Sequence, residues 1–126
     1  MKETFQMFQR DANQLVFSDG QVVFHEGDPG KDVYVVTAGE AEIRIGGRVI
    51  ETLGGGEIFG EMALVEPGQP RAATVAAKGE LKCAVIDEKR FNFLVEQTPR
   101  FALQVMRVLV GRLRRMDSYV SRGQLA

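Results

Sequence analysis

The stretch FGEMALVEPGQPRAATV, residues 59–75, places a carboxylate near its beginning and a guanidinium near its end, with a helical segment and a turn between them. Gly60 has no Cβ, so the backbone there is free to adopt a positive φ and to approach a ligand closely. Residues 61–65 are good helix formers and predict one or two helical turns beginning at Gly60. The unpaired N–H groups at the start of this helix would point outward and suit an anion. The turn formers at residues 67–70 then return the chain to Arg71. The stretch therefore predicts a turn that binds a negatively charged ligand.

Glu61 and Arg71 form different kinds of hydrogen bond, and the difference indicates the chemistry of the ligand. A planar guanidinium holds a phosphate through two parallel, charge-assisted hydrogen bonds, and Arg71 is the only basic residue in the stretch. A carboxylate only accepts hydrogen bonds, as it does from sugar hydroxyls. The turn thus offers a phosphate end at Arg71 and a sugar end at Glu61. The competing interpretation is an ordinary surface turn that carries an unrelated Glu–Arg pair.

These residues resemble a known family, the cyclic nucleotide-binding domains of catabolite activator protein, protein kinase A regulatory subunits and cyclic nucleotide-gated channels. The phosphate-binding cassette of that family has the pattern F-G-E-apolar-A-L, a short variable turn and P-R-small-A-T/S-V, and FGEMAL and PRAATV fill every position. The resemblance implies that Glu61 binds the ribose 2′-hydroxyl and that Arg71 binds the exocyclic phosphate oxygens. Backbone groups of the cassette complete the contacts, and the implied ligand-binding residues are Gly60, Glu61, Met62, Ala63, Arg71, Ala72 and Ala73.

The resemblance also implies the ligand, a 3′,5′-cyclic purine nucleotide. We expect no separate cofactor and, because the chain has one histidine, no metal. In the family a Thr or Ser directly after the cassette arginine often supports guanine through its hydroxyl, whereas this chain has Ala72 at that position. One such hydrogen bond is worth only about 1 kcal/mol, so we expect cAMP to bind more tightly than cGMP while both nucleotides bind.

Length and composition favour one cytoplasmic, globular domain that comprises residues 1–126. The chain is 44% apolar and 26% charged, which is typical of a globular protein with a single core. No apolar run is long enough to cross a bilayer, and the polar start MKETFQMFQRDANQ does not match a signal peptide. The one cysteine, Cys83, excludes an internal disulfide, and its apolar neighbours predict a buried thiol on a strand.

Positive charge is concentrated near the C-terminus. The net charge is −1, yet residues 99–126 carry six Arg and one Asp. This bias fits either a surface for nucleic acid or another acidic partner, or the solvated face of a helix. We favour the solvated helix face, because no DNA-binding motif accompanies the charge.

Residues 15–86 have a period of two with turn residues at short intervals, which predicts an antiparallel barrel. Residues 41–45 alternate as a half-buried strand does, and Gly46-Gly47 suits a two-residue hairpin into residues 48–53. The other predicted strands are residues 22–24, 33–36, 73–76 and 83–86, and the other predicted turns are residues 18–20, 27–30, 38–39 and 54–56. We therefore predict a mainly β fold, an antiparallel jelly-roll barrel interrupted by the cassette helix and flanked by other helices. The glycine turns at residues 27–30 and 37–40 also match the resembling family, and we interpret both as structural.

Helices are predicted on both sides of the barrel. Residues 1–14 form an N-terminal segment in which residues 4–12 favour a short helix. Residues 87–120 predict two C-terminal helices, the first capped by Asp87 and ending near Gln97. This first helix is expected to bury Phe91, Leu94 and Val95. Thr98-Pro99 suit the N-cap and first turn of the second helix.

The second C-terminal helix carries an apolar stripe at three- and four-residue spacing. The stripe consists of Ala102, Val105, Met106, Leu109, Leu113, Met116 and Val120. It suits packing on the barrel, pairing with a second copy in a homodimer, or both, as the equivalent helix does in the resembling family. We expect the helix to act as a mobile lid that hinges at Pro99. The expected lid residues are Leu109, Arg112, Leu113 and Met116.

A single histidine, His25, argues against catalysis. A cupin-like metal site needs several His and carboxylate ligands, and nucleophilic catalysis needs a base beside Ser or Cys. We therefore predict a sensor domain that binds nucleotide and signals through its last helix to an unknown protein partner or a fused effector. Two alternatives stay open: a barrel-type interaction module without physiological nucleotide binding, and a sensor fragment of a larger transcription regulator or channel.

Overall fold

The computed structural model describes the backbone of residues 2–11, 13–66 and 68–121, and the side chains of residues 6–11, 13–63, 66 and 68–115. The chain forms two compact units, Met1–Asn92 and Phe93–Ala126. The expectation that residues 1–126 act as one domain stays a prediction.

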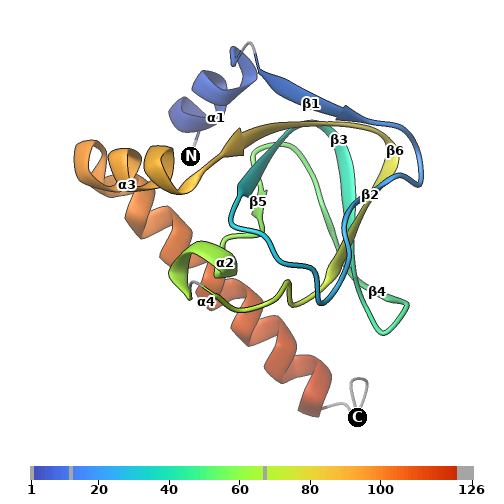
Figure 1. The fold of residues 1–126 in the computed structure, drawn as a ribbon. Helices are drawn as coiled ribbons and strands as arrows, with labels where there is room; N and C mark the ends of the chain where they lie inside the picture. The colour runs from blue at the N-terminus through green and yellow to red at the C-terminus, as the bar shows by residue number, and fades with distance from the viewer. Residues whose placement is uncertain (1, 12, 67, 122–126) are drawn as a thin grey trace. The chain divides into compact units, whose positions relative to one another are not determined.

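The first unit is a curved antiparallel sheet with short helices (Figure 1). Its elements are α1 (Lys2–Gln9), β1 (Gln14–Phe17), β2 (Val22–Phe24), β3 (Val33–Ile45), β4 (Arg48–Leu53), β5 (Ile58–Phe59), α2 (Met62–Val65), β6 (Thr74–Ile86) and the start of α3 (Glu88–Gln97). The sheet order is β1-β6-β3-β4, with β2 also paired to β6 and β5 also paired to β3. The predicted mainly β fold with flanking helices is confirmed.

The two long strands β3 and β6 hold the sheet together and correct one prediction. They pair from Val33↔Ile86 to Arg44↔Thr74, so the segments predicted as four separate strands form two. The predicted turn at residues 38–39 is wrong, because β3 continues through these residues and only its register against β6 shifts there. Gly39 has a φ of +80°, and a Cβ there would collide with the Glu80 carbonyl oxygen of β6. Glycine at this position bends the strand without reversing it.

The hairpin between β3 and β4 is confirmed. Ile45 pairs with Arg48, which leaves Gly46 and Gly47 as the two loop residues. Their φ values of +58° and +79° both lie in the left-handed region that a type I′ turn requires.

The interior of the sheet is apolar. Its buried cluster is formed by Phe17, Val36, Ala41, Ile43, Leu53, Phe59, Val75, Ala77, Leu81 and Cys83. Burial raises the pKa of the Cys83 thiol to about 12, which confirms the predicted buried strand thiol. His25, in contrast, is exposed, with its Nδ1 3.7 Å from Asp28 Oδ2.

The N-terminal helix α1 and the start of α3 meet at Arg90. Its Nη1 donates a hydrogen bond of 2.7 Å to Asp11 Oδ2, and its guanidinium lies 5.0 Å from the ring centre of the buried Phe8. The hydrogen bond from Arg90 lowers the pKa of the Asp11 carboxyl. Asp87 Oδ1 accepts the Arg90 backbone N–H at 2.8 Å, so the predicted cap at Asp87 is confirmed.

The second unit contains the end of α3 and the helix α4 (Pro99–Ser121). α4 begins at Pro99, as the Thr98-Pro99 pair predicts. Of the residues expected to be buried on α3, Leu94 is buried whereas Phe91 and Val95 are half-buried. Among the described side chains of α4, those of Leu103, Met106, Val110 and Leu113 are large, apolar and exposed. Among the described residues, no helix is long and apolar enough to span a membrane.

Candidate functional site

Arg71 is buried at the end of the cassette and is held by backbone groups. Only 6% of the residue is exposed. Its Nη1 donates to the Gly60 carbonyl oxygen at 3.2 Å, and its Nη2 donates to the Asp32 carbonyl oxygen at 3.0 Å. Its own backbone is fixed as well, because its N–H donates to Asp28 O and its carbonyl accepts from Gly27 N–H, both at 2.8 Å. The guanidinium therefore has a defined place before any ligand binds.

The guanidinium of Arg71 lacks an anionic partner within the described part of the chain. Both of its hydrogen-bond acceptors are neutral carbonyls, and no described carboxylate forms an ion pair with it. Its Nε is buried and finds no acceptor among the described groups. A buried charge with an unsatisfied donor is costly, and an anion placed against this edge would relieve that cost.

Two glycines make room for this guanidinium. A Cβ on Gly30 would lie 2.6 Å from both Nε and Nη2 of Arg71. A Cβ on Gly60 would lie 2.9 Å from Arg71 Nη1 and from the Asp32 carbonyl oxygen. Gly60 also has a φ of +82°, which confirms the positive φ predicted for the start of the cassette. Any side chain at either position would displace the arginine.

The cassette helix α2 is a single turn that begins at Met62, two residues later than predicted. The Gly60 carbonyl accepts both the Ala63 N–H at 3.3 Å and Arg71 Nη1, so it joins the two ends of the cassette. Glu61 occupies the N-cap position with only 1% of the residue exposed, and its side chain does not cap the helix. The structure thus buries a carboxylate directly beside the residue that anchors Arg71.

The remaining predicted ligand-binding residues differ in exposure. Met62 is 53% exposed and Ala63 is buried. Ala72 is exposed, whereas Ala73 is half-buried against the core cluster just before β6 begins.

The predicted lid residues all belong to the second unit. Leu109 and Arg112 are half-buried, and Leu113 is 65% exposed. Met116 lies on α4, but its side chain is outside the described residues. Their part in binding stays a prediction.

Three neighbours of Arg71 were not predicted as site residues, namely Phe24, Gly30 and Asp32. The Phe24 ring centre lies 4.2 Å from the Arg71 guanidinium carbon. Phe24 reaches this place because β2 pairs with β6 at the end of the cassette, with Phe24 opposite Val75. The sequence carries a signal only for Gly30, which belongs to the turn at residues 27–30.

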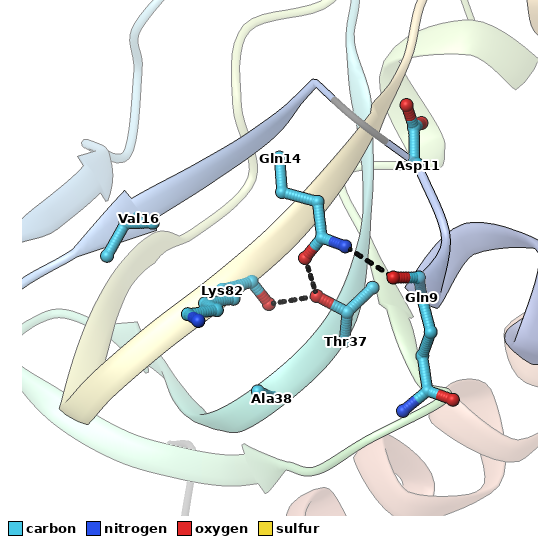
Figure 2. A pocket seen from close by; sticks show the side chains of 7 residues that line it. All are labelled: Gln9, Asp11, Gln14, Val16, Thr37, Ala38 and Lys82. Carbon is cyan, nitrogen blue, oxygen red and sulfur yellow. Dashed lines mark hydrogen bonds between the residues drawn. The ribbon is translucent and has the colours of Figure 1, made fainter.

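A pocket of about 330 Å³ lies elsewhere on the first unit (Figure 2). It is lined by Gln9, Asp11, Gln14, Val16, Thr37, Ala38 and Lys82, and no cassette residue lines it. Figure 2 shows Gln14 between the Thr37 hydroxyl, which its Oε1 contacts, and the Gln9 carbonyl, to which its Nε2 donates at 2.9 Å. The Thr37 hydroxyl also contacts the Lys82 carbonyl oxygen, at 3.1 Å, so the side chains of Gln14 and Thr37 are hydrogen-bonded within the first unit.

Comparison with known proteins identifies the family. The sequence profile of the cyclic nucleotide-binding domain matches residues 14–98, more than half of the chain. The chain belongs to the cyclic nucleotide-binding domain family. The matched range contains β1 to β6, the cassette and α3.

The chain is similar to an effector protein, a kinase regulatory subunit and a catabolite activator protein. The Pycsar effector protein XpPycTIR of Xanthomonas perforans is 31% identical over 102 residues, which cover 81% of this chain and 34% of the relative. A cAMP-dependent protein kinase regulatory subunit of Blastocladiella emersonii is 42% identical over 86 residues, which cover 64% of this chain and 21% of the relative. The solved catabolite activator protein of Thermus thermophilus matches with a TM-score of 0.77 and 26% identity, covering 95% of this chain and 56% of that chain. This likeness confirms the jelly-roll fold, and the chain spans less than two thirds of the length of each of these proteins.

Proposed function

We propose that this cyclic nucleotide-binding domain binds a 3′,5′-cyclic purine nucleotide and acts as a regulatory sensor without catalytic activity of its own. The observation that carries the proposal is the buried Arg71 guanidinium, which is held by two backbone carbonyls and keeps an unsatisfied Nε edge. A planar cation with a free N–H edge matches the oxygens of a phosphate. A cyclic phosphate carries one negative charge, which would balance the charge of Arg71.

In this proposal the cassette divides the ligand between its two ends. Arg71 binds the exocyclic phosphate oxygens, and Glu61 accepts a hydrogen bond from the ribose 2′-hydroxyl. Backbone groups of Gly60, Ala63 and Ala72 complete the contacts, with Met62 and Ala73 beside them. The proposal is supported by the burial of Glu61 next to Gly60, whose carbonyl also anchors the arginine.

We further propose that cAMP binds more tightly than cGMP. Ala72 follows Arg71 and offers no hydroxyl for a guanine. A relative that is 42% identical is described as the regulatory subunit of a cAMP-dependent kinase, which supports the same preference. Because one hydrogen bond is worth about 1 kcal/mol, the preference is expected to be modest, roughly fivefold.

Occupancy is proposed to reach a protein partner or a fused effector of a cytoplasmic signalling pathway through α4. The support is the break at Pro99, where α4 begins, and the exposed apolar residues along the helix. Leu103, Met106, Val110 and Leu113 follow one another at spacings of three and four residues, which suits pairing with a second copy of the helix. A homodimer through α4 is therefore part of the proposal.

Isothermal titration of the chain with cAMP and with cGMP tests this function. Binding of both at one site per chain, with cAMP tighter, is the expected result. Absence of binding by either nucleotide would instead favour an interaction module that keeps the fold without the ligand. Sedimentation velocity with and without cAMP tests the homodimer separately.

A further inference from the structure

The Phe24 ring lies against the guanidinium that the proposed function assigns to the phosphate. We propose that Phe24 is a positioning residue for ligand binding, whose ring face orients Arg71 so that its Nε edge points to the cyclic phosphate. The inference rests on the proposed function, because it describes how the same site is made ready for its ligand.

The contact between Phe24 and Arg71 has the geometry of a cation–π interaction. The guanidinium carbon lies 4.2 Å from the ring centre, well within the distance of about 6 Å at which such pairs attract. Nη1 and Nη2 of Arg71 donate hydrogen bonds to the carbonyl oxygens of Gly60 and Asp32, respectively. The ring thus supplies a third restraint. It acts on the face of the guanidinium, whereas the two carbonyls act on its edge.

A ring is a suitable restraint for an arginine that must also bind an anion. A carboxylate partner would use N–H donors of Arg71 and would compete with the phosphate for its charge. The face of a phenyl ring attracts the cation while it occupies no N–H group and adds no charge. Phe24 therefore holds Arg71 in place and leaves Nε, which has no acceptor among the described residues, for the ligand.

Phe24 is itself fixed by two neighbouring rings. Its ring centre lies 6.0 Å from those of Tyr34 and Phe59, which stack on each other at 5.0 Å and 11°. Phe59 directly precedes Gly60, and Tyr34 lies two residues after Asp32. The two rings that hold Phe24 are thus attached to the same backbone segments that supply the two carbonyl anchors.

The alternative is that Phe24 only stabilises the fold and does not position Arg71. Phe24 is half-buried and packs against the core cluster, so its loss could affect stability alone. Leucine keeps an apolar side chain there but removes the ring, whereas tyrosine keeps the ring. Phe17 offers a matched control, because it belongs to the core cluster, whereas the ring that lies against the Arg71 guanidinium in the described part of the chain is that of Phe24.

The experiment measures cAMP affinity by isothermal titration for the full chain and for Phe24→Leu, Phe24→Tyr and Phe17→Leu, with thermal denaturation of each. Phe24→Leu is expected to weaken binding by about two- to thirtyfold, the range of a single cation–π contact. Phe24→Tyr is expected to stay within about threefold of the unaltered chain, since its ring preserves the contact. Phe17→Leu is expected to lower the melting temperature without changing affinity. If Phe24→Leu does not fold, Phe24→Met serves as the second variant without a ring.

A double-mutant cycle identifies the partner through which Phe24 acts. In an Arg71→Ala background, with weak binding followed by NMR titration, Phe24→Leu is expected to have no further effect on affinity. An equal loss in both backgrounds, an unchanged affinity in Phe24→Leu, or failure of folded Phe24→Tyr to retain binding would each overturn the inference. If the unaltered chain binds no cyclic nucleotide, both the proposed function and this inference fail. If the unaltered chain binds and the Phe24 variants bind with the same affinity, this inference alone fails.

Discussion

Replacing Gly30 with alanine is expected to weaken cAMP binding while the chain stays folded. The φ of Gly30 lies outside the left-handed region, so alanine adds no backbone strain. Its new Cβ would lie 2.6 Å from Nε and Nη2 of Arg71 and 2.9 Å from the guanidinium carbon. These atoms form the end of a flexible side chain, so the expected response is displacement of the guanidinium.

The size of the effect follows from the contacts that Arg71 would lose. Displacement would break two hydrogen bonds from a charged guanidinium to carbonyls, each worth about 1.5–3 kcal/mol, so the free energy of unfolding should fall by at most about 3–6 kcal/mol. The loss of binding free energy cannot exceed the cost of removing a buried charged partner completely, which is about 2–5 kcal/mol. We expect a ten- to hundredfold weaker affinity for cAMP, or about 1.4–2.7 kcal/mol.

Isothermal titration and thermal denaturation of Gly30→Ala test this prediction. Gly54→Ala is the matched control, because its φ is also outside the left-handed region and a Cβ there would meet no atom within 4 Å. The control should match the unaltered chain in affinity and in melting temperature. Binding of cAMP to Gly30→Ala with unaltered affinity would refute the conclusion that the placement of Arg71 controls binding.

Three further predictions concern the sugar, the base and the output of the domain. Glu61→Ala should cost about 1.5–3 kcal/mol in cAMP affinity and should reduce the discrimination against 2′-deoxy-cAMP, whereas equal discrimination in both proteins would contradict the ribose assignment. Ala72→Thr should improve cGMP binding by up to about fivefold in titrations, and no improvement would contradict the role given to the missing hydroxyl. Hydrogen exchange across residues 99–121 should change when cAMP saturates the chain, because a ligand shifts a conformational equilibrium only through differential affinity. Unchanged protection along the whole of α4 would exclude the lid.

The features predicted correctly from the sequence are those that depend on neighbouring residues. Gly46-Gly47 specifies its hairpin through two left-handed residues, and Asp87 caps α3 through an N–H only three residues away. The positive φ of Gly60 follows from the local turn as well. Local chemistry of this kind acts over a few residues and is therefore visible in the sequence.

The features that escaped prediction depend on strand pairing over long distances. Whether Gly39 reverses the chain or bends a continuous strand depends on β6, whose Glu80 carbonyl lies against it. Phe24 lies beside Arg71 only because the register of β2 on β6 places it opposite Val75. The Asp32 carbonyl anchors Arg71 across 39 residues of sequence. No periodicity or spacing within one segment carries such information.

The central claim is that Arg71 binds the phosphate of a cyclic nucleotide, and titration of Arg71→Ala with cAMP tests it most directly. Arg48→Ala is the control, because Arg48 is an exposed arginine on β4 outside the cassette. The account predicts that Arg71→Ala binds cAMP about thirty- to several-thousandfold more weakly while it remains folded, and that Arg48→Ala binds like the unaltered chain. Near-native affinity of a folded Arg71→Ala would contradict the account.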